Sequence, residues 1–331
     1  MPSPGGHALR YGGAAALAVA LVALPFAIPN QFYQRLATEI LIYGLLAMSL
    51  DVLLGFTGLL SFMHASYMGI AAYTVGLYLK FVDPSASPWL LLALGVGATA
   101  LIALPVGWLQ VRTGGFAFAL LSIAFGMMYY TVVWKARNVT GGDDGLIGLA
   151  SPVIGFGGWA LGTTKNPVTM YYFALVVAVA CFLLTRRIIR SPFGAVLESI
   201  RENEERAAFV GFNVHRYKLG GWMLACTLAG AAGVLSAFQN GFVSPTLMDA
   251  NAGGGVLMMV LLGGMGTLWG PYIGAGVFIF VQDYISELTE HWMIFLGGVV
   301  ILLVLFMPEG IAGLRQRLAG TSWQRSSAPS S

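Results

Sequence analysis

Charged residues are scarce in this chain. Only 9% of its 331 residues are charged and 57% are hydrophobic, whereas soluble domains carry roughly 25% charged residues. So few charges cannot cover a water-exposed surface, so the composition excludes a soluble globular protein and makes the lipid bilayer the expected solvent. The formal net charge of +3 is also too small to indicate a nucleic-acid surface.

The motifs of nucleotide binding and hydrolysis are absent as well. No G-x-x-x-x-G-K-[ST] sequence and no Gly-Lys pair occurs, so the chain has no P-loop for nucleotide phosphates. Neither H-E-x-x-H nor G-x-S-x-G is present. The four histidines are scattered along the chain, at His7, His64, His215 and His291. We therefore expect no catalytic centre, no metal site and no cofactor bound by this chain itself.

Apolar runs long enough to cross a bilayer follow one another along the chain. A helix rises 1.5 Å per residue, so crossing the hydrocarbon takes about 20 apolar residues. Such runs lie at residues 11–29, 36–56, 61–80, 89–109, 115–134, 168–185, 218–238, 251–269, 271–288 and 291–307. The sequence predicts an all-α integral membrane protein of about ten transmembrane helices. They form one domain, 1–314, followed by a tail, 315–331, predicted to be disordered.

Two glycine-rich stretches, 55–76 and 253–276, permit broken or re-entrant helices instead of straight ones. They also share a short pattern, L-L-G-x-x-G-x-L, at residues 53–60 and 261–268. Duplicated halves are common in transporters, but Leu and Gly are frequent enough here for a chance match. The sequence leaves both interpretations open.

Basic residues concentrate in one segment, 186–218, which holds seven of the 17 Lys and Arg residues. By the positive-inside rule this segment is cytoplasmic. Six expected spans precede it and four follow it, so both termini are predicted on the cytoplasmic side. The polar stretch 135–167 is then an outer loop.

The basic segment carries the signals of two short helices. Ser191 is a suitable N-cap for the first helix, with Pro192 at its first position. Apolar residues then recur at helical spacing: Phe193, Val196, Leu197 and Ile200. Asn203 is a suitable N-cap for the second helix, and Gly211 permits a left-handed residue that ends it.

The second short helix presents acidic residues first and an apolar run afterwards, namely Glu204, Glu205, Ala207, Ala208, Phe209 and Val210. An apolar knob flanked by charges suits docking into a groove of a soluble partner. It equally suits a helix that rests on anionic lipid headgroups. Spacing alone leaves both interpretations open.

Ionisable side chains inside predicted spans are costly and mark functional hypotheses. Asp51 and His64 flank a glycine break formed by Gly55 and Gly58. An unwound backbone there would line a polar path, so these four residues are candidate path residues. The alternative is a structural Asp with a bonded partner and a satisfied histidine near a helix end.

The outer loop contains a flexible acidic turn: Thr140, Gly141, Gly142, Asp143 and Asp144. Nothing near the paired carboxylates supplies a nucleophile or a metal partner. The turn is a candidate docking element for an extracytoplasmic partner, or simply a turn.

Six blocks, in order, resemble the LivM-type permeases of branched-chain amino acid ABC importers, a family that includes permeases for urea and amides. The blocks are L-G-F-T-G-L-L-S (54–61) with His64-Ala65 and A-Y-T (72–74), T-G-G (140–142) with D-G-L (144–146), S-P-F-G (191–194), G-F-N-V (211–214) with R-Y-K (216–218), G-F-V-S-P (241–245), and L-G-G-M-G-T-L-W-G-P (262–271). The chain departs from this pattern in having Asp51 where relatives are expected to have Asn. It also lacks the E-A-A-x-x-x-G sequence of many other importer permeases.

The resemblance implies a bacterial plasma-membrane permease that works with a second permease subunit, two cytoplasmic ATPases that bind ATP and Mg, and an extracytoplasmic binding protein. It also implies that residues 191–211 couple the permease to an ATPase. The candidate coupling residues are Ser191, Pro192, Phe193, Gly194, Glu198, Arg201, Glu202, Asn203, Ala207 and Gly211. Two rival hypotheses remain. One is a secondary carrier or channel energised by an ion gradient, with Asp51 or Glu39 as its coupling carboxylate, and the other is a membrane enzyme that acts on lipid and uses Asp143 and Asp144 with a distant histidine.

Overall fold

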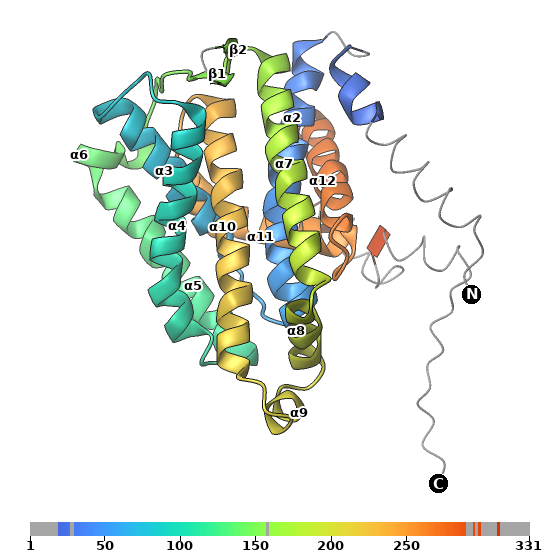
Figure 1. Ribbon diagram of the computed structural model, residues 1–331. Helices are drawn as coiled ribbons and strands as arrows, with labels where there is room; N and C mark the ends of the chain where they lie inside the picture. Colours follow the sequence, from blue (N-terminus) through green and yellow to red (C-terminus); the bar gives the residue numbers. More distant parts are fainter. Residues whose placement is uncertain are drawn as a thin grey trace.

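The computed structural model describes residues 19–26, 30–156 and 159–288, together with residues 294, 297, 298, 310 and 311. The long helices are α2 (Gln31–Asp51), α3 (Ala65–Phe81), α4 (Pro88–Gln110), α5 (Gly115–Lys135), α7 (Pro167–Ile189), α10 (Val214–Asn240), α11 (Ala250–Gly263) and α12 (Gly270–Leu288). They form an elongated bundle (Figure 1).

Short elements lie at the two ends of this bundle. One end carries α8 (Pro192–Glu202) and α9 (Glu204–Phe209), and we call it the α9 end. The other carries an antiparallel hairpin of β1 (Val153–Phe156) and β2 (Trp159–Thr163), and we call it the hairpin end (Figure 1). The connection between α5 and α7 also contains α6 (Arg137–Thr140) and a 3-10 turn, Gly142–Asp144. The all-α prediction is therefore corrected at this hairpin.

Five helices of the described chain are long and apolar enough to cross a membrane: residues 31–57, α4, α5, α7 and α10. A multi-pass helical membrane protein is thus confirmed, but the structure does not confirm the ten-helix count. Most of the predicted span 291–307 lies outside the described residues, which include only residues 294, 297 and 298 of it. Of the predicted span 11–29, the structure describes a helical stretch at 19–26.

Two predicted spans near the glycine-rich stretches have different bounds. The span predicted at 251–269 is interrupted, because α11 ends at Gly263 after 14 residues. Gly264 and Gly266 follow with positive φ angles of 105° and 74°, which right-handed helices do not contain. The span predicted at 61–80 begins as a helix only at Ala65.

The end of α2 is distorted into a π-helical turn, Val52–Thr57. The Thr57 hydroxyl donates a hydrogen bond to the carbonyl oxygen of Val52, which supports the wider turn. Gly58 stops the helix with a φ of 75°, the left-handed conformation common at helix C-termini. The chain therefore changes direction at the break that the sequence predicts.

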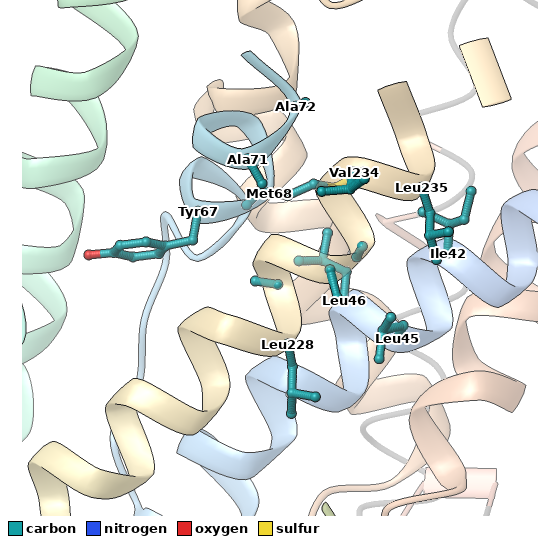
Figure 2. Packing of buried hydrophobic residues seen from close by; sticks show 14 of the residues in the cluster. Ile42, Leu45, Leu46, Tyr67, Met68, Ala71, Ala72, Leu228, Val234 and Leu235 are labelled. Atoms are coloured by element: carbon teal, nitrogen blue, oxygen red, sulfur yellow. The ribbon is translucent and has the colours of Figure 1, made fainter. Parts of the chain in front are cut away.

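Helices α2 and α10 form the buried centre of the bundle. Their most apolar windows are 78% and 83% buried, whereas the window of α5 is only 22% buried. Leu45 and Leu46 of α2 lie close to Leu228 of α10 in the core (Figure 2). Gly233 lets α10 approach α3, since a Cβ there would lie 2.0 Å from the carbonyl oxygen of Met68. The outer faces of α4 and α5 are left for lipid or for another chain.

Candidate functional site

The turn from α7 into α8 is fixed by the Ser-Pro-Phe-Gly sequence. Pro192 occupies the first helical position, as predicted. The Ser191 hydroxyl does not cap the helix but donates a 2.6 Å hydrogen bond back to the carbonyl oxygen of Ile188. A Cβ on Gly194 would lie 1.9 Å from the carbonyl oxygen of Ile189, so only glycine fits this close turn. The sequence therefore sets the angle at which α8 leaves the bundle.

Helix α9 begins as predicted at Asn203, whose side chain accepts a 2.8 Å hydrogen bond from the amide of Arg206. Ala207 is buried in a small apolar cluster with Val196 and Ile200 of α8. Gly211 ends the segment with a φ of 102°. The two short helices thus pack on each other as one unit, which we call the α8–α9 hairpin.

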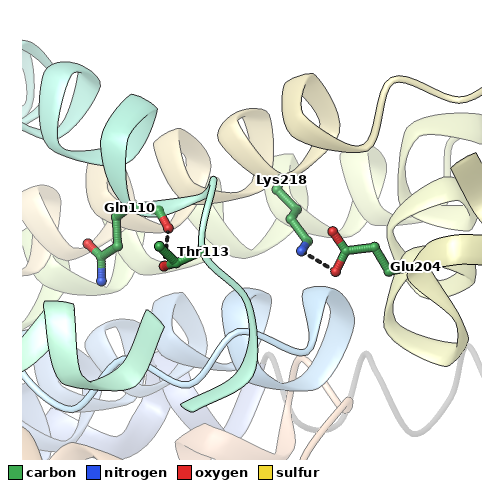
Figure 3. Close-up of polar contacts among 4 residues, drawn as sticks. All are labelled: Gln110, Thr113, Glu204 and Lys218. Atoms are coloured by element: carbon green, nitrogen blue, oxygen red, sulfur yellow. Dashed lines mark hydrogen bonds and ion pairs between the residues drawn. The ribbon is translucent and has the colours of Figure 1, made fainter. Parts of the chain in front are cut away.

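An ion pair joins this hairpin to the first turns of α10. The Nζ of Lys218 lies 2.5 Å from the Oε2 of Glu204 (Figure 3). The Lys218 side chain is 3% exposed and that of Glu204 is 53% exposed. Because a buried ammonium group needs a counter-charge, Lys218 holds α9 against the bundle. Phe193 of α8 also stacks on Tyr217 with 5.6 Å between ring centroids.

Arg201 of α8 connects the hairpin to the break in α2. Its Nη1 donates a hydrogen bond to the carbonyl oxygen of Gly55 in the π-helical turn. A Cβ on Gly58 would lie 3.1 Å from the Cγ of Arg201, and one on Gly266 would lie 3.5 Å from its Nη1. One side chain of the predicted coupling segment therefore touches both glycine turns of the bundle.

Asp51 bonds the end of α2 to the second of these glycine turns. Its Oδ1 accepts a 2.8 Å hydrogen bond from the backbone amide of Gly266, in the turn between α11 and α12. A Cβ on Gly55 would lie 2.3 Å from this carboxylate oxygen and 2.4 Å from the Gly266 nitrogen, so the junction requires glycine there. We call Asp51, Gly55, Gly58, Arg201 and Gly266 the coupling junction.

His64 is not part of the coupling junction, although the sequence groups it with Asp51. Its Nε2 lies 2.9 Å from the Ser49 hydroxyl. The same hydroxyl lies 2.6 Å from the carbonyl oxygen of Leu46, so it bridges the imidazole and the backbone of α2. The Nδ1 is buried and has no hydrogen-bond partner in the described chain. The predicted path residues therefore separate into two sites.

The other predicted coupling residues divide by exposure. Gly194 and Ala207 are buried, so they shape the hairpin and present no surface to a partner. Glu198, Glu202 and Asn203 are exposed. An exposed apolar pair lies at the end of α9, where Phe209 is 89% exposed and Val210 is 72% exposed. The sequence does not reveal that these two side chains point away from the bundle. An apolar pair beside the helix-ending Gly211 is the signal that marks this surface.

The acidic turn of the predicted outer loop is rigidly built. Gly141, Gly142 and Gly145 all have positive φ angles, and a Cβ on Gly141 would lie 1.9 Å from the carbonyl oxygen of Gly145. Asp143 and Asp144 are exposed.

Two further contacts fix the surroundings of this turn. The Thr140 hydroxyl donates to the carbonyl oxygen of Val133, at 2.6 Å. Leu146 forms a β-bridge with Val243, which ties the loop to the segment after α10. Within the described ranges no group of three or more His, Cys, Asp or Glu residues is placed to hold a metal ion.

Comparison with known proteins gives consistent matches over most of the chain. The sequence model of the family described as branched-chain amino acid transport system / permease component matches residues 32–305. The chain is 28% identical over 314 residues to the high-affinity branched-chain amino acid transport system permease protein LivM of Escherichia coli (strain K12), covering 89% of this chain and 73% of LivM.

A second permease protein of the same kind also matches. The chain is 27% identical over 293 residues to LivH of Escherichia coli (strain K12), covering 82% of this chain and 91% of LivH. The permease protein BraD of Pseudomonas aeruginosa is 23% identical over 301 residues, with the same coverage of 82% and 91%. No solved structure matches the chain.

Proposed function

Because the chain belongs to the family of branched-chain amino acid transport system permease components, we propose that it is the membrane-spanning permease subunit of an ATP-driven importer for branched-chain amino acids. The similar relatives are named as permease proteins of such systems, which favours this solute over urea or short amides. They are not named as enzymes, and this disfavours the lipid-active enzyme as well.

A second permease subunit is the first partner of this proposal. The chain is 28% identical to LivM and 27% identical to LivH, both named as permease proteins of a high-affinity branched-chain amino acid transport system in one organism. This supports a pore built from two related chains. The exposed outer faces of α4 and α5 supply apolar surface for such a pairing.

Two cytoplasmic ATPases are the partners at the α9 end, which the positive-inside rule assigns to the cytoplasm. The proposal that an ATPase docks here is supported by the exposed tip of the hairpin, formed by Phe209 and Val210. The hairpin that bears this tip is anchored to the bundle by the Glu204–Lys218 ion pair. Burying one such side chain in a groove stabilises a complex by roughly 1.5–3 kcal/mol. Glu198 and Glu202 are exposed, and in this proposal they contact the rim of that groove.

The coupling junction suggests how motion of the ATPases reaches the bundle. The apolar cluster joins α8 to α9, so the hairpin moves as one body, and the Glu204–Lys218 ion pair ties that body to α10. Arg201 then carries that movement to Gly55, and Asp51 transfers it to the turn at Gly266. Two helix breaks thus shift together, as switching of the bundle between inward and outward openings requires.

An internal duplication fits this arrangement. Gly58 and Gly266 occupy the same position of the repeated L-L-G-x-x-G-x-L pattern, and their φ angles are 75° and 74°. Each glycine follows the end of one helix and precedes another, α3 or α12. We infer that the two segments are equivalent parts of two related halves that meet at Asp51.

The remaining rival is a secondary carrier that works alone with Asp51 as its coupling carboxylate. Asp51 is fully buried and one of its oxygens is bonded to the Gly266 amide, which favours a structural role. Reconstitution separates the two functions: with its ATPases, partner permease and binding protein, the chain is expected to accumulate leucine only when ATP is supplied. Accumulation by this chain alone, driven by an ion gradient, would overturn the importer proposal.

A further inference from the structure

A second polar site lies at the hairpin end, far from the coupling junction. It is a cavity of about 290 Å³ that is lined in part by residues from the start of α2, the start of α7 and the end of α10. These three helices contact one another and end together at the hairpin end of the bundle (Figure 1). This volume is near the lower limit of about 300 Å³ for small-molecule sites, so the cavity suits a small metabolite. None of the candidate residues predicted from the sequence lines it.

One wall of the cavity is electropositive. Arg35 and Lys165 line it, and neither makes an ion pair within the described part of the chain. Among the described residues that line the cavity, none is acidic. Pro167, at the first position of α7, also lines the cavity, but it has no N–H and the Val168 amide is bonded to the Asn166 side chain, so the attraction for an anion comes from the two basic side chains. This wall is built to attract a carboxylate.

A second wall of the cavity, beside Arg35, offers hydrogen-bond acceptors. It is formed by the last turn of α10, which ends at Asn240 and is capped by Gly241. The last carbonyl groups of a helix have no intrahelical partner and carry partial negative charge. The Gln239 side-chain amide donates to the carbonyl oxygen of Arg35, at 3.3 Å, so its Oε1 remains an acceptor. This wall is suited to an ammonium group.

Two apolar side chains and one buried hydroxyl complete the lining. Leu149 and Phe238 line it and are nearly fully buried. Thr164 is only 4% exposed, and its Oγ1 has no partner in the described chain. A buried hydroxyl without a partner costs about 1–3 kcal/mol, so it favours a polar occupant.

We propose that this cavity binds a zwitterionic amino acid with an apolar side chain, with its carboxylate on Arg35 and Lys165 and its ammonium group at the end of α10. The apolar side chain lies against Leu149 and Phe238. The proposal rests on the proposed function, because it makes the cavity the first docking place of the solute on the permease. A carboxylate can also come from an acidic side chain of the binding protein, and the test separates the two sources.

The test uses the full chain in lipid nanodiscs without partner proteins. Binding of radiolabelled leucine is measured by scintillation proximity, with 4-methylpentanoate and 3-methylbutylamine as competitors that lack the ammonium or the carboxylate. We expect leucine to bind, 4-methylpentanoate to compete more weakly than leucine, and 3-methylbutylamine not to compete. Arg35→Met and Lys165→Met should each weaken leucine binding at least about tenfold, because hydrogen bonds to charged groups are lost.

Lys80→Met is the matched control, since Lys80 is an exposed lysine at the end of α3 that does not line the cavity. Equal leucine binding in all three variants would overturn the proposal. A second result would also overturn it: the wild-type chain binds no leucine, and Arg35→Met and Lys165→Met impair docking of the binding protein. The carboxylate that the cavity attracts would then be an acidic side chain of the binding protein. ATP-driven uptake by the assembled transporter is measured separately, and its absence would contradict the proposed function without affecting the nanodisc result.

Discussion

The guanidinium of Arg201 in α8 donates a hydrogen bond to the carbonyl oxygen of Gly55, 146 residues earlier in the chain, at the π-helical break of α2. A segment outside the membrane bundle is thereby bonded to the one place where the buried helix α2 departs from α-helical geometry. The carbonyl oxygens of a π-helical turn and of a helix end are incompletely used by the helix itself. The break therefore offers a free carbonyl oxygen that can accept a hydrogen bond from an arginine side chain.

Replacing Gly55 by alanine should destabilise the coupling junction. Its Cβ would lie 2.3 Å from the Asp51 carboxylate and 2.4 Å from the Gly266 nitrogen. Forcing extra volume into a close-packed site costs roughly 1–3 kcal/mol. We expect a lower thermal midpoint in detergent. Gly97→Ala is the control, because nothing lies within 4 Å of its Cβ position, and a midpoint drop of equal size there would refute the steric explanation.

Asp51→Asn should preserve transport, because the amide oxygen of Asn still accepts the hydrogen bond from the Gly266 amide. Asp51→Leu, which leaves that amide without its acceptor, should reduce uptake and stability. Uptake of leucine by the assembled transporter and the thermal midpoint of the purified chain measure the two effects. Loss of uptake in a well-assembled Asp51→Asn variant would show that the negative charge is needed, as the carrier hypothesis requires.

Phe209→Ser should weaken association with the ATPase and leave membrane insertion unchanged. Phe209 is 89% exposed, so the permease itself loses little packing when it is replaced. A loss of roughly 1.5–3 kcal/mol of apolar burial predicts a binding constant weaker by about 10- to 150-fold. Phe26→Ser is the control, because Phe26 is 79% exposed in the helical stretch at 19–26. Pull-down of the ATPase at equal strength by both variants would contradict docking through this tip.

Glu204→Gln should loosen α9 more than Glu205→Gln does. It leaves the buried Lys218 ammonium without its counter-charge, whereas Glu205 has no such partner among the described ion pairs. Since Glu204 is half exposed, water screens part of the loss and the expected cost is about 1 kcal/mol. Hydrogen exchange of the amides of α9 measures it. We expect faster exchange in Glu204→Gln alone. Equal exchange in both variants would show that the ion pair does not hold α9 against α10.

The local structure of the α8–α9 hairpin could be predicted from the sequence, whereas its attachment to the bundle could not. Pro192, Asn203 and Gly211 mark the ends of the short helices by their own backbone chemistry, which needs no distant partner. The Arg201–Gly55 and Asp51–Gly266 contacts join residues 146 and 215 positions apart. No local pattern specifies such pairs, so Arg201 was predicted only as a coupling residue.

The helix count shows the same limit. Hydropathy gives apolar runs of the right length, but Gly264 and Gly266 end α11 at Gly263 because their positive φ angles cannot continue a helix. The orientation of Phe209 was also beyond prediction, since a helix of six residues is too short to show an apolar face by periodicity. The strands β1 and β2 lie in a stretch, 153–163, that is apolar and glycine-rich, with a Gly-Gly pair at 157–158 between Val, Ile, Phe and Trp residues. This is a hairpin signal, and a search for runs long enough to cross a membrane does not detect it.

The coupling role of Arg201 is tested most directly by the ratio of leucine transported to ATP hydrolysed in the reconstituted importer. In Arg201→Gln the hydrogen bond to the Gly55 carbonyl is weakened while the α9 tip and the Glu204–Lys218 pair remain. We expect ATP hydrolysis to continue and leucine uptake to fall at least about tenfold, with partial recovery in Arg201→Lys. An unchanged ratio in Arg201→Gln would show that the motion of the ATPases reaches the bundle by another route.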